Sequence, residues 1–174
     1  MTLRVRIKYS KRYPATLIGH LDTMGVFQRG MRMAGWPLEF TRGFNPRIKL
    51  SSGPPLSLGV SSNAEYLDVA LRRRMSAYRS GLLKEKLIEG LEVVDISEIE
   101  KDDPGINTII SGFDYQVIGE VLEKNPPFSK CSLREKDGEI FVRVMKVDGN
   151  IANPSKVSGL KGCSYKKIKT LFVD

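Results

Sequence analysis

Residues 3–9 read LRVRIKY, and their strict alternation predicts the first element of the fold. Four apolar residues would share one side of an extended chain, namely Leu3, Val5, Ile7 and Tyr9. Three cations would share the opposite side, namely Arg4, Arg6 and Lys8. Because successive side chains of a strand point to opposite faces, this pattern is typical of a half-buried strand. We therefore expect a β-strand with a cationic outer face.

The segment that follows, residues 20–34, has the periodicity of a helix. Its apolar residues recur at helical spacing: Leu21, Met24, Phe27, Met31 and Ala34. Gly25 and Gly30 would each weaken a helix by about 1 kcal/mol relative to alanine. Such residues are tolerated where the backbone must approach a neighbour, so we expect this helix to pack tightly against a strand. Gly35 is a plausible stop signal directly after it.

The remainder of the first hundred residues repeats this alternation of elements. Short strands are predicted at residues 36–41, 48–51, 64–71 and 91–100, and a second helix at residues 76–89 with Ser76 as its N-cap. The order over residues 1–100 is read as β-α-β-β-α-β. This order predicts an α+β, ferredoxin-like domain over residues 1–100, in which two helices cover one face of a four-stranded antiparallel sheet.

The segment KDDPG at residues 101–105 is polar and contains a proline, so we place a domain boundary there. Residues 106–174 predict a smaller β-rich C-terminal domain. It would contain a strand near residues 113–122, a turn at KNPPF (residues 124–128), a hairpin around Asp137-Gly138, a loop over residues 150–160 and a final strand over residues 166–174.

The charge of the chain is concentrated near its N-terminus. The formal net charge is +8, from 28 basic and 20 acidic residues. Residues 1–49 contain ten basic and two acidic residues, which accounts for the whole excess, and residues 50–174 contain 18 of each sign. A solvated, solubilising surface is the simpler explanation. Because the imbalance is regional and rich in arginine, we favour a nucleic acid as partner.

Several classes of function are excluded by composition. The chain has one histidine, His20, and two cysteines, Cys131 and Cys163. These cannot form a disulfide framework, a four-ligand zinc site or an iron–sulfur cluster, so we expect no metal and no cofactor. No run of about 18 apolar residues exists, and the N-terminus lacks the apolar region of a signal peptide, so we expect a cytoplasmic protein with no membrane contact.

Five motifs resemble one known family. They are YSK at residues 9–11, GHLD at 19–22, FQR at 27–29, AGWPLEFTRGFNPRIKLSSGPPLSLGV at 34–60 and AEYLDV at 64–69. On these motifs, over residues 4–100, the chain resembles the bacterial radical-SAM-linked domain of unknown function. The resemblance implies association with a radical-SAM protein and with RNA-processing or ribosomal neighbours. The chain departs from the family pattern at residues 142–150, VRVMKVDGN, and it lacks the cysteine triplet of a radical enzyme.

His20 is the candidate catalytic residue. Beside Asp22 at a helix start, it could act as a general acid or base on a phosphodiester, with Arg42, Arg47 or Lys11 stabilising charge. CRISPR repeat-RNA endonucleases have ferredoxin-like domains with a histidine near the first helix, and the chain shows a fold-level resemblance to them. The alternative, which we favour, is that His20 is a neutral helix cap and that Asp22 complements the helix dipole.

The candidate nucleic-acid contacts are cations of the N-terminal third and two residues of the loop around Gly43. They are Arg4, Arg6, Lys8, Lys11, Arg29, Arg32, Arg42, Phe44, Asn45 and Arg47. Arginine suits bidentate contact with phosphate, and Phe44 could stack on a base or pack inward. The run Arg72-Arg73-Arg74 could also bind phosphate, although a solvated turn is favoured there.

The sequence as a whole favours an RNA-binding accessory protein without catalytic activity, which would present RNA or a ribosomal component to a radical-SAM partner. A metal-independent ribonuclease using His20 is the first alternative. A protein-interaction domain whose basic face docks a radical-SAM enzyme is the second. The sequence does not specify the RNA or the oligomeric state.

Overall fold

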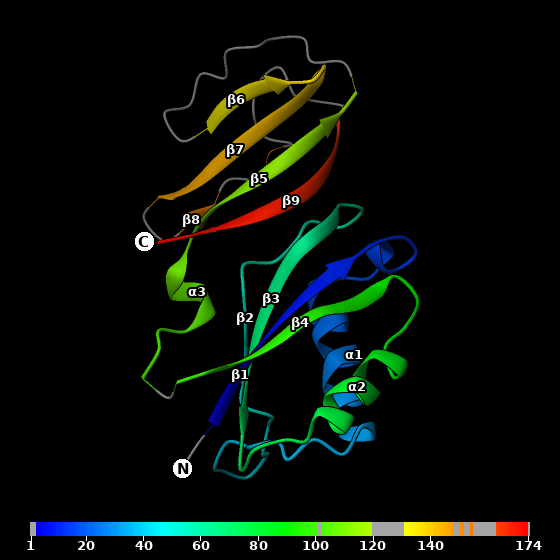
Figure 1. The fold of residues 1–174 in the computed structure, drawn as a ribbon, viewed down its shortest axis with the longest axis vertical. Helices are drawn as coiled ribbons and strands as arrows, with labels where there is room; N and C mark the ends of the chain where they lie inside the picture. Colours follow the sequence, from blue (N-terminus) through cyan, green and yellow to red (C-terminus); the bar gives the residue numbers. More distant parts are fainter. Residues whose placement is uncertain are drawn as a thin grey trace.

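A computed structural model of the chain describes residues 3–100, 102–119, 131–147, 150–151, 154 and 163–173 (Figure 1). The strands are β1 (Leu3–Lys11), β2 (Leu50–Ser52), β3 (Ser61–Leu71), β4 (Leu91–Ile99), β5 (Ile110–Ile118), β6 (Cys131–Lys136), β7 (Glu139–Val147), β8 (Asn150–Ile151) and β9 (Ser164–Phe172). The helices are a short 3₁₀ turn (Ala15–Leu17), α1 (His20–Met33), α2 (Ala77–Glu85) and α3 (Ile106–Ile109).

One mixed sheet runs through the described residues. Its strand order is β4-β1-β3-β9-β5-β7-β6, with β2 beside β3 and β8 beside β7. The pairings β1–β3, β1–β4 and β2–β3 are antiparallel, whereas β3 and β9 pair in parallel through Ser61–Ser62 and Lys166–Lys167. The chain is therefore a mixed α/β protein, and its sheet continues from the first hundred residues into the C-terminal residues.

The first core lies between the sheet and two helices. Val5, Ile7 and Tyr9 of β1 are at most 3% exposed, as the alternation predicted. They belong to one buried cluster with Phe27 of α1 and Leu83 of α2. Both helices accordingly cover the same face of β1, β3 and β4 (Figure 1). Burial of this apolar face is what orients α1 and the segments attached to its ends.

Two expectations about α1 are wrong. Leu21 was predicted to face inward, yet it is 82% exposed. Leu21 precedes the buried Phe27 by six residues, which corresponds to one full turn of the helix plus about 240°. The two side chains therefore point to different faces of the helix. Gly30 allows a close helix–helix approach rather than the expected contact with a strand, because a Cβ there would lie 3.1 Å from Leu83 Cδ1. A Cβ on Gly25 would meet nothing nearer than 4.0 Å.

The segments between α1 and β4 also differ from prediction. Residues 36–41 do not form a regular strand; they make isolated bridges from Leu38 to Leu71 and from Phe40 to Ile48. Pro37 lacks the N–H that a continuous ladder needs. Helix α2 ends at Glu85 rather than at residue 89. The chain must turn there, because Arg12 N–H donates to Gly90 O over 2.7 Å and Leu91 then pairs with Lys11.

The second core is formed by β5, β7, β9 and α3, with Ile106 of α3 fully buried. The predicted hairpin is confirmed: Asp137 and Gly138 both have positive φ, 53° and 77°, between β6 and β7. Helix α3 was not predicted. The expected turn at residues 124–128 lies outside the described residues, as does most of the loop predicted over residues 150–160. No described helix combines the length and the apolar character that crossing a bilayer requires.

Candidate nucleic-acid interface

A surface cavity opens where the end of α1 meets the segment after it and the end of β3. Its volume is about 470 Å³, and it is lined by Arg32, Trp36, Pro37, Leu38, Phe40, Arg72 and Arg73. We call these seven residues the arginine groove. The floor is rigid, because Trp36 and Leu38 are at most 5% exposed and Trp36 Nε1 donates to Arg79 O over 2.9 Å. Arg72 N–H donates to Pro37 O over 2.8 Å and ties the two walls together.

Two guanidinium groups lie over the ring of Phe40 in this groove. The Cζ atoms of Arg32 and Arg72 are 6.0 Å and 5.5 Å from the ring centroid. Phe40 is half-buried, and the arginines are exposed. Cation–π contacts of this kind orient a guanidinium while leaving its donors available. The site therefore combines oriented positive charge with an aromatic surface.

The loop over residues 41–47 is an exposed hairpin tip beyond Phe40. Thr41 N–H donates to Arg47 O over 2.8 Å, and Arg47 N–H donates to Thr41 Oγ1 over 2.9 Å. Phe44 is fully exposed and does not pack inward. Arg42, Asn45 and Arg47 are exposed as well. This loop presents the charge and the aromatic ring that the sequence predicted for it, beside the arginine groove.

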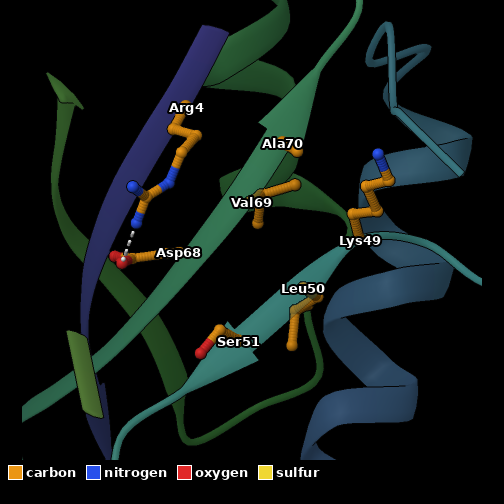
Figure 2. Close-up of a pocket in the computed structure, with 7 residues that line it drawn as sticks. All are labelled: Arg4, Lys49, Leu50, Ser51, Asp68, Val69 and Ala70. Atoms are coloured by element: carbon orange, nitrogen blue, oxygen red, sulfur yellow. Dashed lines mark hydrogen bonds and ion pairs between the residues drawn. The ribbon is translucent and has the colours of Figure 1, made fainter. Parts of the chain in front are cut away.

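Arg4 and Arg6, predicted as a cationic outer face, instead bind a buried carboxylate. Arg4 Nη2 lies 3.1 Å and Arg6 Nε 2.8 Å from Asp68, which is 3% exposed and also accepts a 2.9 Å hydrogen bond from Ile106 N–H. Figure 2 shows Arg4 reaching across from β1 to Asp68 on β3. One carboxylate from the facing strand thus balances one of the two positive charges of Arg4 and Arg6 within the protein.

The cavity drawn in Figure 2 has a volume of about 250 Å³ and is lined by Arg4, Lys49, Leu50, Ser51, Asp68, Val69 and Ala70. Lys49 forms an ion pair with Glu39, so both cations that line this cavity are paired with carboxylates.

Lys8 is half-buried opposite Tyr66 on β3 and Asp95 on β4. RNA contact by Arg4, Arg6 and Lys8 stays a prediction, as does their common surface with Arg42 and Arg47. Arg29 is exposed on α1.

Lys11, predicted as a phosphate contact, is buried instead. It is 3% exposed, and its Nζ donates to Ile18 O over 2.8 Å. Burial lowers its pKa, and the negative charges of Glu65 and Asp22 oppose that shift. The alternation of β1 accounts for this position, because Lys11 follows Ile7 and Tyr9 at two-residue spacing and so lies on the same, buried face of the strand.

His20 is the first residue of α1, and its N-cap is Gly19, so the histidine is not the predicted cap. Its Nε2 lies 3.1 Å from Ser52 Oγ on β2, within hydrogen-bond distance. Burial lowers the pKa of His20, Glu65 opposes this effect, and Lys11 adds to it. The lowered pKa favours the neutral form of the imidazole at pH 7, and Asp22 lies in the first turn of the helix.

The lowered pKa of His20 can be measured directly because the chain contains a single histidine. We expect the imidazole proton resonances of the folded protein to titrate with a midpoint below 6.5, the usual value. Since the unfolded chain then binds the proton more readily, stability should fall as the pH falls below 6.5 toward the folded-state value. His20→Asn should flatten this dependence in urea titrations. A midpoint above 6.5 would contradict the prediction.

His20 also adjoins a buried ion pair that joins the two cores. Lys167 Nζ on β9 lies 2.8 Å from Glu65 Oε1 on β3, and both residues are at most 5% exposed. The ammonium is also 3.5 Å from the centroid of the Phe113 ring. Glu65 lies next to the parallel β3–β9 contact, so this pair holds the two parts of the sheet together.

His20 and the loop arginines are at opposite ends of α1. The helix has 14 residues and is about 20 Å long. His20 begins it, whereas Arg32 in its last turn contacts Phe40, from which the loop of Arg42 and Arg47 extends away. This arrangement does not favour the hypothesis that these two arginines stabilise charge at a phosphodiester bound to His20, which stays a prediction. Of its proposed helpers, Lys11 alone is near.

Sequence reasoning missed several residues of these sites. Phe40 of the arginine groove was not predicted, and Arg72 and Arg73 were named as possible phosphate contacts although a solvated turn was favoured for them. Ser52 and Glu65 interact with His20, and Lys167 pairs with Glu65, but no local pattern relates these residues to His20, because they come from three different strands. Among the described residues, no group of three or more His, Cys, Asp or Glu side chains is arranged to hold a metal ion.

Comparison with known protein families gives a match over most of the chain. The model of a family described as "Uncharacterized protein conserved in bacteria (DUF2344)" matches residues 4–147. This range extends from the second residue of β1 to the end of β7 and contains all residues of the arginine groove. No curated protein matches the chain.

Proposed function

We propose that this chain, which belongs to the conserved bacterial family that matches residues 4–147, is an RNA-binding accessory protein. The observation that carries the proposal is the arginine groove, where Arg32 and Arg72 flank Phe40 beside the exposed loop of residues 41–47. Proteins bind RNA through phosphate contacts from arginine and stacking on aromatic rings, and this surface supplies both.

The charge balance of the surface supports a polyanionic ligand. Arg42, Arg47, Arg32, Arg72 and Arg73 are all exposed, and the described residues that line the groove include no carboxylate. Each phosphate contact would release counterions, so the affinity for RNA should decrease steeply with salt. By contrast, the paired charges of Arg4, Arg6 and Lys49 contribute less.

Neutralising the loop should weaken binding and its salt dependence together. We expect the double variant Arg42→Gln/Arg47→Gln to reduce RNA affinity and to flatten the slope of log K against log salt by about 1–2. Lys84→Gln/Lys86→Gln removes the same charge from exposed positions at the end of α2 and is the matched control. Filter binding at several salt concentrations measures both. An unchanged slope in the loop variant, or an equal loss in the control, would contradict the proposal.

A metal-independent ribonuclease is the second candidate, because His20 Nε2 and Ser52 Oγ lie 3.1 Å apart and the neutral imidazole could accept a proton. The fold-level resemblance to CRISPR repeat-RNA endonucleases is in line with it. RNA cleavage in EDTA that His20→Ala abolishes and wild type retains would support this candidate. A structural histidine is favoured, because the arginines proposed to assist it lie at the other end of α1.

The arrangement of residues 3–99 supports the proposal that they form a ferredoxin-like domain. Strand order β4-β1-β3-β2, antiparallel pairing and two helices on one face are what a ferredoxin-like domain requires, and the C-terminal strands would then form the proposed second domain.

We also propose a radical-SAM protein as partner, from the resemblance of the motifs. Retention of such a protein on the immobilised full chain, at a salt concentration that removes RNA, tests this partner.

A further inference from the structure

The arginine groove has the dimensions of a small-molecule site. Its volume of about 470 Å³ lies within the range of about 300–1,000 Å³ that is usual for ligand pockets. The floor is preformed, because Leu38 is bridged to Leu71 and the indole of Trp36 is hydrogen-bonded to Arg79 O. A site fixed by such contacts loses little entropy when it binds a ligand.

The cations of the groove are available to a ligand. Within the part of the chain that the structure describes, Arg32, Arg72 and Arg73 form no ion pair with a carboxylate. The neighbouring Arg74, outside the groove, is paired with Glu98 over 3.5 Å. Three exposed guanidinium groups around one aromatic ring therefore present donors for phosphate together with planar surfaces.

From this geometry we propose that the arginine groove binds one unpaired nucleotide of single-stranded RNA. The base stacks against Phe40 or the adjoining guanidinium planes of Arg32 and Arg72, and a neighbouring phosphate is bound by Arg73. This inference rests on the proposed RNA-binding function and specifies its substrate class. In a duplex each base is stacked within the helix and its faces are not accessible, whereas an unpaired base can enter a pocket and stack on aromatic or arginine side chains.

The closing experiment separates stacking from charge. Fluorescence anisotropy of the full chain would compare a short unstructured RNA, the same strand in a duplex, and the same strand with a single abasic position. We expect tighter binding of the single strand than of the duplex. Phe40→Leu should weaken binding of the single strand by about 5- to 100-fold, the range for loss of one base–aromatic stack, with little effect on the duplex.

Two further variants keep this test interpretable. Phe40→Tyr retains the ring and should retain affinity, and Arg74→Gln removes a groove-adjacent charge that is already paired. Because Phe40 is half-buried, melting temperatures of all variants would show whether Phe40→Leu still folds, and Arg32→Gln/Arg72→Gln tests the same site without changing the ring.

The outcomes distinguish the two proposals. If no RNA binds, the proposed function fails. If the single strand and the duplex bind equally, and Phe40→Leu leaves both affinities unchanged, RNA binding stands but the nucleotide site is overturned. If Arg32→Gln/Arg72→Gln weakens binding no more than Arg74→Gln does, the site is overturned as well. Preference for the single strand that depends on Phe40 supports the site.

Discussion

Replacing Lys167 by methionine should lower the free energy of unfolding by about 3–5 kcal/mol. The ammonium of Lys167 is 2.8 Å from Glu65 Oε1, and both residues are at most 5% exposed. Without Lys167 the Glu65 carboxylate would remain buried beside Tyr9, where water cannot replace the lost partner. Urea unfolding followed by circular dichroism measures the change.

The adjoining lysine provides the control for this prediction. Lys166 is less buried than Lys167 and points to the other face of β9, so Lys166→Met should change stability by no more than about 0.5 kcal/mol. The double variant Glu65→Gln/Lys167→Met removes both charges and should recover most of the loss, since a neutral pair avoids the unpaired buried charge. A double variant as unstable as the sum of the single variants would refute the coupling of Glu65 and Lys167.

Removal of the Asp68 carboxylate should have an effect of similar size. Asp68→Ala would remove the carboxylate that pairs with Arg4 and Arg6 and that accepts the hydrogen bond of Ile106 N–H. We expect a loss of about 3–5 kcal/mol, because one buried carboxylate satisfies all three groups. The same unfolding experiment measures it.

Asp95 provides the comparison for Asp68, because it is an exposed aspartate of β4 that faces Lys8 across the sheet. Asp95→Ala should cost no more than about 0.5 kcal/mol. If Asp68→Ala cost as little as Asp95→Ala, the ion pairs of Arg4 and Arg6 would be no more than surface contacts, and their charge would be free for RNA after all.

The sequence could predict the elements whose signal is local. The alternation of residues 3–9, the apolar spacing of residues 20–34 and the Asp137-Gly138 turn each depend on the pitch of one element or on the φ preference of adjacent residues. All three are present in the structure, as β1, α1 and the β6–β7 hairpin. The turn residues around Gly43 also indicated a loop that carries Arg42 and Arg47, but the sequence left open whether Phe44 would be exposed or pack inward.

The tertiary structure alone decided which charged side chains remain available to bind a ligand. Arg4 and Arg6 face Asp68, which is more than sixty residues away in the chain, and Glu65 faces Lys167, which is about a hundred residues away. The periodicity of a sequence predicts the face on which a side chain lies. It does not predict which residue of a neighbouring strand lies opposite that side chain. The arginine groove has the same origin, because Arg32, Phe40 and Arg72 meet only when α1 and β3 pack on one core. Local preferences thus set the elements, whereas the pairing and packing of distant strands, which depend on the free energy of the whole fold, set the candidate site.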